Sequence, residues 1–382
     1  MIIKNGMVFE PEQGFVKRDV CIEGDSISDC PNGEELNAER LYVIPGLMDI
    51  HFHGCVGYDF CDGTKEAIRQ MAEYQLKNGI TNICPASMTF SEEQLTEIFE
   101  NAAQYHSNQG ARLVGINMEG PFISVEKKGA QNPKYIHRPD VAMFERLQKA
   151  AGGLIKIVDI APETEGAMEF IEKVSHRVRV SLAHTTADFE TAKEAFLQGA
   201  NHVTHLYNAM PPLSHRAPGV IGAACDDEKV MVELICDGIH SHPSVVRTTF
   251  KMFGDDRIIM ISDSMMACGL EDGQYTLGGQ DVTVCGNKAT LTQEGNIAGS
   301  VTNLMNCVRT AVKEMDIPLE SAVKCAAVNP AKAIGLYDRY GSLEIGKKAD
   351  VVLLDKELNI QYVIQDGQVI YKTANGRKKV FA

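Results

Sequence analysis

The stretch GLMDIHFHG, residues 46–54, decides how the rest of the chain is interpreted. It begins as an apolar run typical of a buried strand and ends with two histidines, His51 and His53. Because side chains alternate along a strand, residues two apart point to the same side. The pair is therefore either two ligands of one metal site or two polar residues where the chain reaches the surface. The surrounding sequence has to decide between these interpretations.

Further apolar segments with strand character follow, and most are succeeded by a helical pattern. Together with residues 44–51 they cover 80–88, 112–119, 155–161, 178–184, 201–206, 230–237 and 257–263. Eight strand–helix units predict an α/β fold, a (β/α)8 TIM-like barrel of the metal-dependent hydrolase type, whose strands are buried on both faces. The alternative is an open doubly wound sheet, but no Gly-rich phosphate turn follows the first strand.

The two ends of the chain have a different pattern from the middle. Residues 1–43 and 342–382 alternate between apolar and polar side chains and contain Asn-Gly and Asp-Gly turns. We expect both ends to form one small β-sandwich domain, with the catalytic barrel, residues 44–341, inserted between them. A Gly-rich segment at about 270–299 is expected to form β-hairpins over the barrel mouth.

Composition limits the function classes. The hydrophobic content of 44% and the charged content of 23% are ordinary for a globular enzyme. A net charge of −14 argues against nucleic-acid binding. We find neither a signal pattern at the start nor an apolar run that could span a bilayer. The eleven cysteines lack CxxC spacing and fit reduced thiols. We therefore expect a cytoplasmic protein without nucleic-acid or membrane partners.

Polar residues gather at the predicted strand ends, which is where the reactive groups of such barrels lie. They are four histidines and two carboxylates: His51, His53, Glu119, His184, His205 and Asp263. This set of nitrogen and oxygen donors suits Zn²⁺, Fe²⁺, Mn²⁺ or Co²⁺. Without a metal, burying so many ionisable groups would cost much desolvation energy. The sequence therefore predicts a metal site at the barrel mouth.

The direction of two of these side chains follows from strand parity. His184 shares parity with Val180 and Leu182, and we expect it to continue an inward-facing row. The same argument places Asp263 in the row of Ile259 and Ile261. A lone histidine at a strand end is more often structural, and that interpretation is favoured for His202 and His242.

The motif PGLMDIHFHG resembles the first-strand motif of the amidohydrolase superfamily, barrel metalloenzymes with one or two divalent metals. More narrowly, the chain resembles the N-acetylglucosamine-6-phosphate deacetylase family in MEGPFISVEKKGAQNP, LAHTTA, THLYNAMPPLSHRAPG, CDGIH and ISDSMMACG. The likeness extends over nearly the whole chain, to GSLEIGKKADVVLLD. It implies hydrolysis of the acetamide of N-acetyl-D-glucosamine 6-phosphate to D-glucosamine 6-phosphate and acetate, in amino sugar catabolism.

The resemblance also implies roles for the ligands. The recurrent metal site of the family maps onto Glu119, His184 and His205. Many superfamily members bridge two metals with a carboxylated lysine after strand 4, but Lys156 lies at the wrong end of that strand, so Glu119 is the implied bridge. With His51 and His53 present, a second ion is expected between them, Glu119 and Asp263. The cofactor is one or two divalent ions, Zn²⁺ or Fe²⁺ before Mn²⁺ or Co²⁺.

Asp263 is the expected catalytic residue, because a carboxylate there can take a proton from the attacking water and deliver it to the departing amine. The resemblance assigns substrate contacts to the following residues: Ala130, Gln131, Asn208, Ala209, Arg216, His240, Ile297, Ala298 and Gly299. Asn208 and Ala209 would offer backbone N–H groups, and Arg216 and His240 would bind the phosphate.

Gln131 departs from some relatives, which have a histidine that helps to orient the N-acetyl group. Its amide can donate a hydrogen bond but cannot carry charge. Lys127 and Lys128 are interpreted as a solvated charge pair. The resemblance further implies a homodimer, in which a residue of the neighbouring subunit completes the phosphate site.

Three alternatives stay open. The substrate could be N-acetylgalactosamine 6-phosphate, which differs by the orientation of one hydroxyl. The reaction could be another amidohydrolase chemistry, such as N-acyl amino acid deacylation or deamination, although those substrates do not need the phosphate-binding segment. The least favoured alternative is a non-catalytic metal-binding barrel, because such a protein would not need all six ligands.

Overall fold

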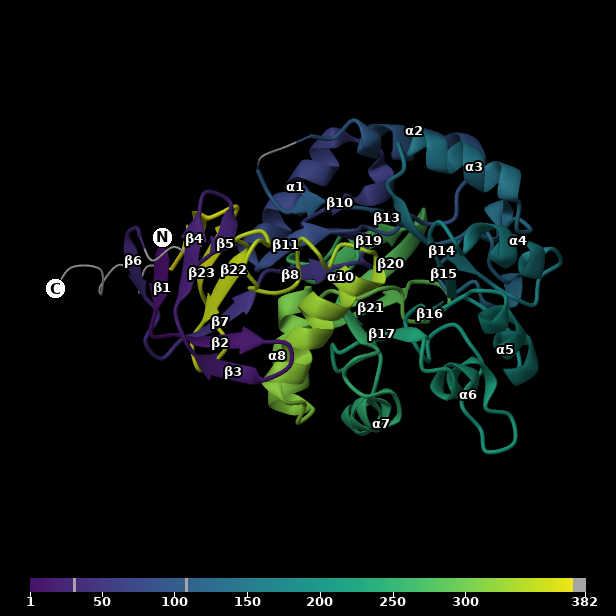
Figure 1. Ribbon diagram of the computed structural model, residues 1–382. Coiled ribbons are helices and arrows are strands. Elements are labelled where there is room, and N and C mark those ends of the chain that lie inside the picture. The colour runs from purple at the N-terminus through teal and green to yellow at the C-terminus, as the bar shows by residue number, and fades with distance from the viewer. Residues whose placement is uncertain (30–31, 107–108, 374–382) are drawn as a thin grey trace.

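The computed structural model describes residues 1–29, 32–106 and 109–373. The predicted β domain therefore extends beyond the described residues at 30–31 and 374–382. Figure 1 shows two parts: a layered β part, which holds the N-terminus, and a larger part in which helices surround a ring of strands. Within the described ranges, no helix has both the length and the apolar character needed to cross a membrane.

Parallel strands form the ring in the larger part. They are β8 (Leu47–Asp49), β11 (Ile80–Ile83), β13 (Ile116–Met118), β14 (Ile155–Ile160), β15 (Arg179–Leu182), β16 (His202–Val203), β17 (Met231–Ile235) and β18 (Ile258–Ile261). Strands β13 to β18 make one sheet, and β8, β11 and β12 (Arg112–Leu113) make a second. The two sheets meet at a bridge between Ala86 and Asn117 and, on the other side, through the Asp263 N–H, which donates to the His51 carbonyl at 2.9 Å. The predicted barrel is confirmed, and the open sheet is excluded.

Helices cover the outside of the barrel (Figure 1). They are α1 (Lys65–Lys77), α2 (Glu92–Ala103), α3 (Val141–Ala150), α4 (Ala167–Val174), α5 (Phe189–Leu197), α6 (Gly219–Asp226), α7 (Pro243–Phe253) and α8 (Leu304–Glu314). Shorter elements lie in the connections: β9 (Gly54–Cys55), β10 (Tyr58–Asp59), η1 (Phe60–Asp62), η2 (Val125–Lys127) and η3 (Pro133–Tyr135). A continuous helical stretch ends the barrel part, α9 (Leu319–Val323), η4 (Lys324–Val328) and α10 (Asn329–Ala333).

Two apolar cores result from this arrangement. The outer core lies between strands and helices and includes Val180, Leu182 and Phe196. The inner core fills the barrel below the mouth, and its members include Met48, Ile50, Ile157, Ile235, Ile259, Ile261 and Ala331. Burial on both faces explains why these strands appear as continuous apolar runs in the sequence.

The β part is a sandwich of two sheets built from both ends of the chain. One sheet has the order β5 (Ser26–Ser28), β4 (Val20–Glu23), β1 (Ile2–Lys4), β6 (Glu35–Asn37). The other has the order β24 (Gln368–Lys372), β23 (Ile360–Gln365), β22 (Val351–Leu354), β7 (Tyr42–Pro45), β2 (Met7–Glu10), β3 (Gly14–Lys17). Side chains from both ends, such as Val8, Ile22, Val351 and Ile364, share its core.

The chain passes from the sandwich into the barrel at Gly46. The predicted strand 44–51 is in fact divided there, since β7 pairs with β2 and β22 of the sandwich and β8 with β11 of the barrel. A Cβ on Gly46 would overlap the side chain of Thr81, so glycine lets the two backbones approach. An ion pair between Arg112 Nη1 and Asp350 Oδ2, at 2.5 Å, further connects the two parts.

An antiparallel sheet follows β18, where β-hairpins are predicted. It consists of β19 (Gly273–Leu277), β20 (Gln280–Cys285) and β21 (Lys288–Leu291). Its own apolar cluster includes Leu277, Val282 and Leu291 together with Met88 of the barrel. The insertion therefore packs on the barrel and brings its end near the mouth.

Candidate active site

Three of the predicted ligands leave their strands through the same backbone turn. His184, His205 and Asp263 each lie two residues beyond the end of β15, β16 and β18. Their φ angles are 44°, 29° and 49°, in the left-handed region that non-glycine residues rarely adopt. Each such residue costs about 1–3 kcal/mol and persists only where its surroundings enforce it. The shared conformation directs these side chains into the barrel mouth.

This turn corrects the parity argument for His184. Val180 and Leu182 belong to the outer core, so the row that was expected to face inward faces the helices. Ser181 faces inward instead, and its hydroxyl lies 2.6 Å from Thr204 Oγ1. His184 nevertheless points into the mouth, from a residue whose left-handed φ interrupts the regular alternation. For Asp263 the preceding row does face inward as predicted, since Ile259 and Ile261 lie in the inner core, but its own left-handed φ of 49° interrupts the regular alternation as well.

The first metal group consists of Glu119, His184 and His205, all buried. Glu119 Oε1 lies 3.0 Å from His184 Nε2 and 3.1 Å from His205 Nε2. The two Nε2 atoms are 3.2 Å apart. Three donor atoms from three strands thus converge on one point.

The second metal group consists of His51, His53 and Asp263. Asp263 Oδ1 lies 3.4 Å from His53 Nε2 and 3.7 Å from His51 Nε2. The His51 ring is fully buried, yet its Nε2 has no hydrogen-bond partner among the described residues. A buried polar atom is rarely left unpaired, and here it faces two carboxylates across a gap too long for a hydrogen bond.

These distances fit divalent metal ions. Two ligands about 2.1 Å from one tetrahedral ion lie about 3.4 Å apart. The donor separations given above range from 3.0 to 3.7 Å, and all donor atoms within each group lie within 4.8 Å of one another. Imidazole nitrogen and carboxylate oxygen are donors that Zn²⁺ and Fe²⁺ accept. Glu119 also reaches the second group, with Oε2 at 3.3 Å from His53 Nε2, so its carboxylate contacts donors of both groups.

Charges and hydrogen bonds within the two metal groups keep the carboxyl groups of Glu119 and Asp263 ionised despite their burial. Burial alone would raise the pKa of Glu119, but the hydrogen bonds to His184 and His205 hold it well below its usual range. Asp263 behaves alike: burial opposes ionisation, and the contact with His53 lowers the pKa below normal. For His51, burial would lower the pKa, but Glu233 raises it well above normal. Concentrated negative charge thus favours a cation at this point.

The second ring nitrogen of several ligand histidines is also held. Nδ1 of His184 lies 2.8 Å from the Lys127 carbonyl, and Nδ1 of His53 lies 3.3 Å from the Ala86 carbonyl. Such outer partners fix the ring orientation of metal ligands. Gln131 supports Glu119 in the same way, because its Nε2 donates to Glu119 Oε2 at 2.6 Å while its Oε1 accepts from the Thr89 N–H.

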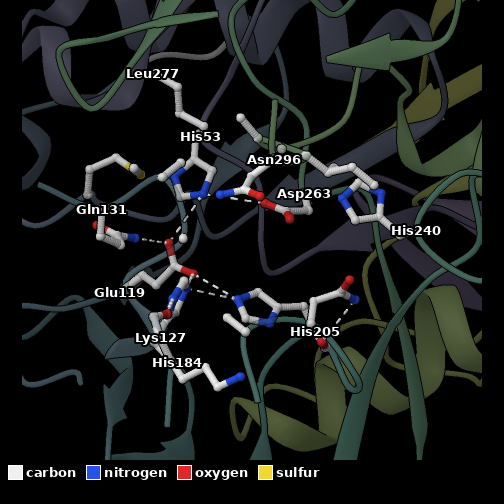
Figure 2. A pocket seen from close by; sticks show the side chains of 18 of the residues that line it. His53, Glu119, Lys127, Gln131, His184, His205, His240, Asp263, Leu277 and Asn296 are labelled. Atoms are coloured by element: carbon white, nitrogen blue, oxygen red, sulfur yellow. Dashed lines mark hydrogen bonds and ion pairs between the residues drawn. The ribbon is translucent and has the colours of Figure 1, made fainter. Parts of the chain in front are cut away.

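A cavity of about 350 Å³ opens above the two groups. Figure 2 shows His53, Glu119, His184, His205 and Asp263 at its wall, with Gln131, Lys127 and His240 around them. Most predicted substrate contacts line it: Ala130, Gln131, Asn208, Ala209, His240, Ile297, Ala298 and Gly299. His240 is oriented by Asp237, whose Oδ2 lies 2.7 Å from its Nδ1.

Arg216 is the predicted contact that the structure does not bring to this cavity. It lies on an exposed loop with a tight turn bridging Ser214 and Ala217. Its Nη1 lies 2.8 Å from His215 Nε2. Arg216 is exposed and does not line the cavity to which His240 belongs.

The two lysines also differ from the expected solvated pair. Lys127 lines the cavity, and its backbone carbonyl is the partner of His184. Lys128 pairs with Glu294 of the hairpin insertion, Nζ to Oε1 at 3.2 Å. The structural interpretation of His242 is confirmed, because its ring caps the N-terminus of α7. His202 is fully buried, and its burial lowers its pKa to about 4.

Sequence reasoning missed a polar layer inside the barrel, directly below the site. Glu233 is fully buried with Oε2 at 2.8 Å from His51 Nδ1. Asp159 is buried beside it and accepts a hydrogen bond from Thr204 Oγ1 at 2.9 Å. The available signal was a carboxylate within an otherwise apolar strand, since charged residues are almost never fully buried without a partner.

Comparison with known proteins agrees with this geometry. The model of the amidohydrolase family matches residues 42–377. The N-acetylglucosamine-6-phosphate deacetylase of Bacillus subtilis (strain 168) is 37% identical over 348 residues, which cover 89% of this chain and 88% of that protein. The N-acetylgalactosamine-6-phosphate deacetylase of Escherichia coli O157:H7 is 32% identical over 338 residues, covering 88% and 89%.

A solved structure gives the same result. It is a mutant N-acetyl-D-glucosamine-6-phosphate deacetylase of Mycobacterium smegmatis in complex with N-acetyl-D-glucosamine-6-phosphate. It matches with a TM-score of 0.91 at 30% identity and covers 97% of this chain and 99% of that one. With a family model over most of its length and such relatives, the chain belongs to the amidohydrolase family and, within it, to the N-acetylglucosamine-6-phosphate deacetylases.

Proposed function

We propose that this enzyme hydrolyses the acetamide of N-acetyl-D-glucosamine 6-phosphate to D-glucosamine 6-phosphate and acetate, a step of amino sugar catabolism. The observation that carries the proposal is the convergence of six ligands beside a cavity whose wall holds the Asn208–Ala209 segment and His240. The names of the relatives and the sugar phosphate bound in the Mycobacterium smegmatis structure support the same substrate.

The two metal groups account for the chemistry. Divalent ions held by Glu119, His184 and His205, and by His51, His53 and Asp263, would supply the Lewis acidity that polarises an amide carbonyl and activates water. Asp263 takes the proton of the attacking water and passes it to the departing amine, which is otherwise a poor leaving group. Its lowered pKa keeps it ionised and ready to act as the base. We propose two ions per chain, with Zn²⁺ or Fe²⁺ before Mn²⁺ or Co²⁺.

Gln131 acts chiefly by holding Glu119. Its two amide atoms already bond to Glu119 and to the Thr89 N–H, so it replaces the histidine of some relatives without adding a charge. The backbone N–H of Ala209 orients the sugar, whereas that of Asn208, predicted for the same role, already donates to the His205 carbonyl at 2.9 Å. Ile297, Ala298 and Gly299 also line the cavity.

The phosphate is bound by His240, and Lys127, which also lines the cavity, is the second cation available to it. Arg216 would reach it from a second copy of the chain, which makes the active enzyme a homodimer. The exposure of Arg216 outside the cavity, together with the 46% exposed side chain of Leu213 on the same loop, supports this arrangement. We place the enzyme in the cytoplasm, in keeping with free thiols at the cysteines in the described ranges.

The test is acetate release by the purified protein, measured together with its metal content, on N-acetylglucosamine 6-phosphate and on unphosphorylated N-acetylglucosamine. Fast release from the phosphorylated sugar alone is expected, and a chelator should abolish it. Equal rates on both sugars would refute the phosphate site, and no release from either would refute the function.

One relative supports a second candidate substrate. The Escherichia coli N-acetylgalactosamine-6-phosphate deacetylase is 32% identical to this chain, so the galacto epimer is the competing substrate. The ratio of kcat/KM for the two epimeric sugar phosphates distinguishes them, and we expect the gluco epimer to be preferred.

A further inference from the structure

Glu233 has an unusual position for an ionised side chain. It lies on β17, inside the barrel, and both it and His51 are fully buried. Its neighbours Val232 and Leu234 belong to the outer core, so Glu233 faces the interior. Its Oε2 lies 2.8 Å from His51 Nδ1, within hydrogen-bond distance. A buried carboxylate is tolerated only where a partner of this kind compensates its desolvation.

The contact determines how His51 can act. An imidazole that donates from Nδ1 presents the lone pair of Nε2, which is the atom a metal takes. In this orientation His51 Nε2 faces Glu119 Oε1 at 3.6 Å and Asp263 Oδ1 at 3.7 Å. In His53 and His184, Nδ1 instead lies beside a backbone carbonyl oxygen, which is present whatever the side chain at that position. Of the three histidines His51, His53 and His184, it is therefore His51 whose ring orientation depends on a replaceable side chain.

We propose that Glu233 is a positioning residue that sets the occupancy of the second metal position, by holding His51 as a ligand of the second metal group. The proposal rests on the metal-dependent function proposed above and extends it to a residue that contacts neither substrate nor metal.

The first metal group does not depend on Glu233 to the same degree. His184 and His205 meet Glu119 directly, at 3.0 and 3.1 Å. Glu233 does accept from the His205 N–H with its side chain, at 3.2 Å. Beside that bond, the Leu206 N–H donates at 2.8 Å to the backbone carbonyl of Glu233, which every substitution retains. Loss of the carboxylate should therefore affect the two ions unequally.

The experiment is a titration of metal-stripped full-length protein with Zn²⁺ against a chromophoric chelator, with metal content measured after gel filtration. The variants are Glu233→Gln, which keeps an acceptor, and Glu233→Leu, which removes it. Asp159→Asn is the matched control, because Asp159 is equally buried and bonds to Thr204 rather than to a ligand histidine. Melting curves show whether each variant folds.

We expect the wild type to bind two ions, with the weaker Kd raised about 10- to 100-fold by Glu233→Leu and less by Glu233→Gln. The tighter Kd should stay within about twofold. In the His51→Ala background, Glu233→Leu should change the weaker Kd very little. Both substitutions remove the same His51–Glu233 interaction, so their effects should not add. If Glu233→Leu does not fold, Glu233→Gln and its double variant with His51→Ala decide.

Three results would overturn the proposal: one ion in the wild type, unchanged Kd values in the folded Glu233 variants, or an equal effect of Asp159→Asn. The role of Glu233 and the proposed function can fail separately. If the Glu233 variants lose the second ion but the wild type releases no acetate, the role of Glu233 is upheld and the proposed function is refuted.

Discussion

The Oε2 atom of Glu119 lies 3.3 Å from the Nε2 atom of His53. The other oxygen of the same carboxyl contacts His184 at 3.0 Å. One side chain therefore joins a donor group from the first and last strands of the barrel to a donor group from its middle strands. A single carboxylate thus links the two metal positions.

Glu119→Gln should impair both positions at once, because an amide offers one oxygen where a carboxylate offers two. Metal ions stabilise the charge of the transition state by several kcal/mol, and losing this stabilisation should lower kcat by about 10³-fold. Metal analysis and acetate release check this, with Glu294→Gln, on an exposed carboxylate paired to Lys128, as the control. A variant that keeps two ions and half of its turnover would contradict the bridging role.

Asp263→Asn should keep the ion of the first metal group and lose turnover, because its amide cannot carry a proton. General acid–base catalysis contributes about 10²- to 10⁴-fold, and a fall of kcat in this range is expected. The measurement is kcat at saturating substrate, with metal content determined on the same sample. Near-normal turnover would show that another group moves the proton.

The buried His202 should make stability depend on pH. Its pKa is about 4 in the folded chain and about 6.5 when unfolded, so between these values the unfolded chain binds the proton and the folded chain does not. Stability conferred by neutral His202 is therefore lost as the pH falls from above 6.5 toward 4, by about 2 kcal/mol between pH 7 and pH 5.

Denaturant unfolding of metal-stripped protein at pH 7 and pH 5 tests this. His202→Gln should reduce the difference between the two free energies, whereas His176→Gln, at an exposed histidine, should follow the wild type. Equal pH dependence of His202→Gln and wild type would contradict the assignment.

Gly46→Ala should destabilise the chain, because the new Cβ would overlap Thr81 where the sandwich joins the barrel. Overpacking of this kind costs about 1–3 kcal/mol, measurable as a lower Tm. Thr81→Ala should restore part of the loss when combined with it. An unchanged Tm for Gly46→Ala would contradict this, because it would mean that the Thr81 side chain can move aside without cost.

The sequence by itself determined the order of strands and helices, the contribution of both ends to a β-sandwich, and the six polar residues at the strand ends. These features follow from apolar periodicity and from residue chemistry, which are local. Parity also identified the inward-facing row of Ile259 and Ile261, which precedes Asp263.

Only the tertiary structure decided how the other side chains act. His184 faces the mouth at a left-handed residue that parity cannot anticipate. At Gly46, where the chain leaves the sandwich, the Thr81 side chain leaves no room for a Cβ. The pairing of Glu233 with His51 joins residues 182 positions apart, and Arg216 lies outside the cavity that His240 lines. Such contacts depend on how the barrel closes, which no local pattern encodes.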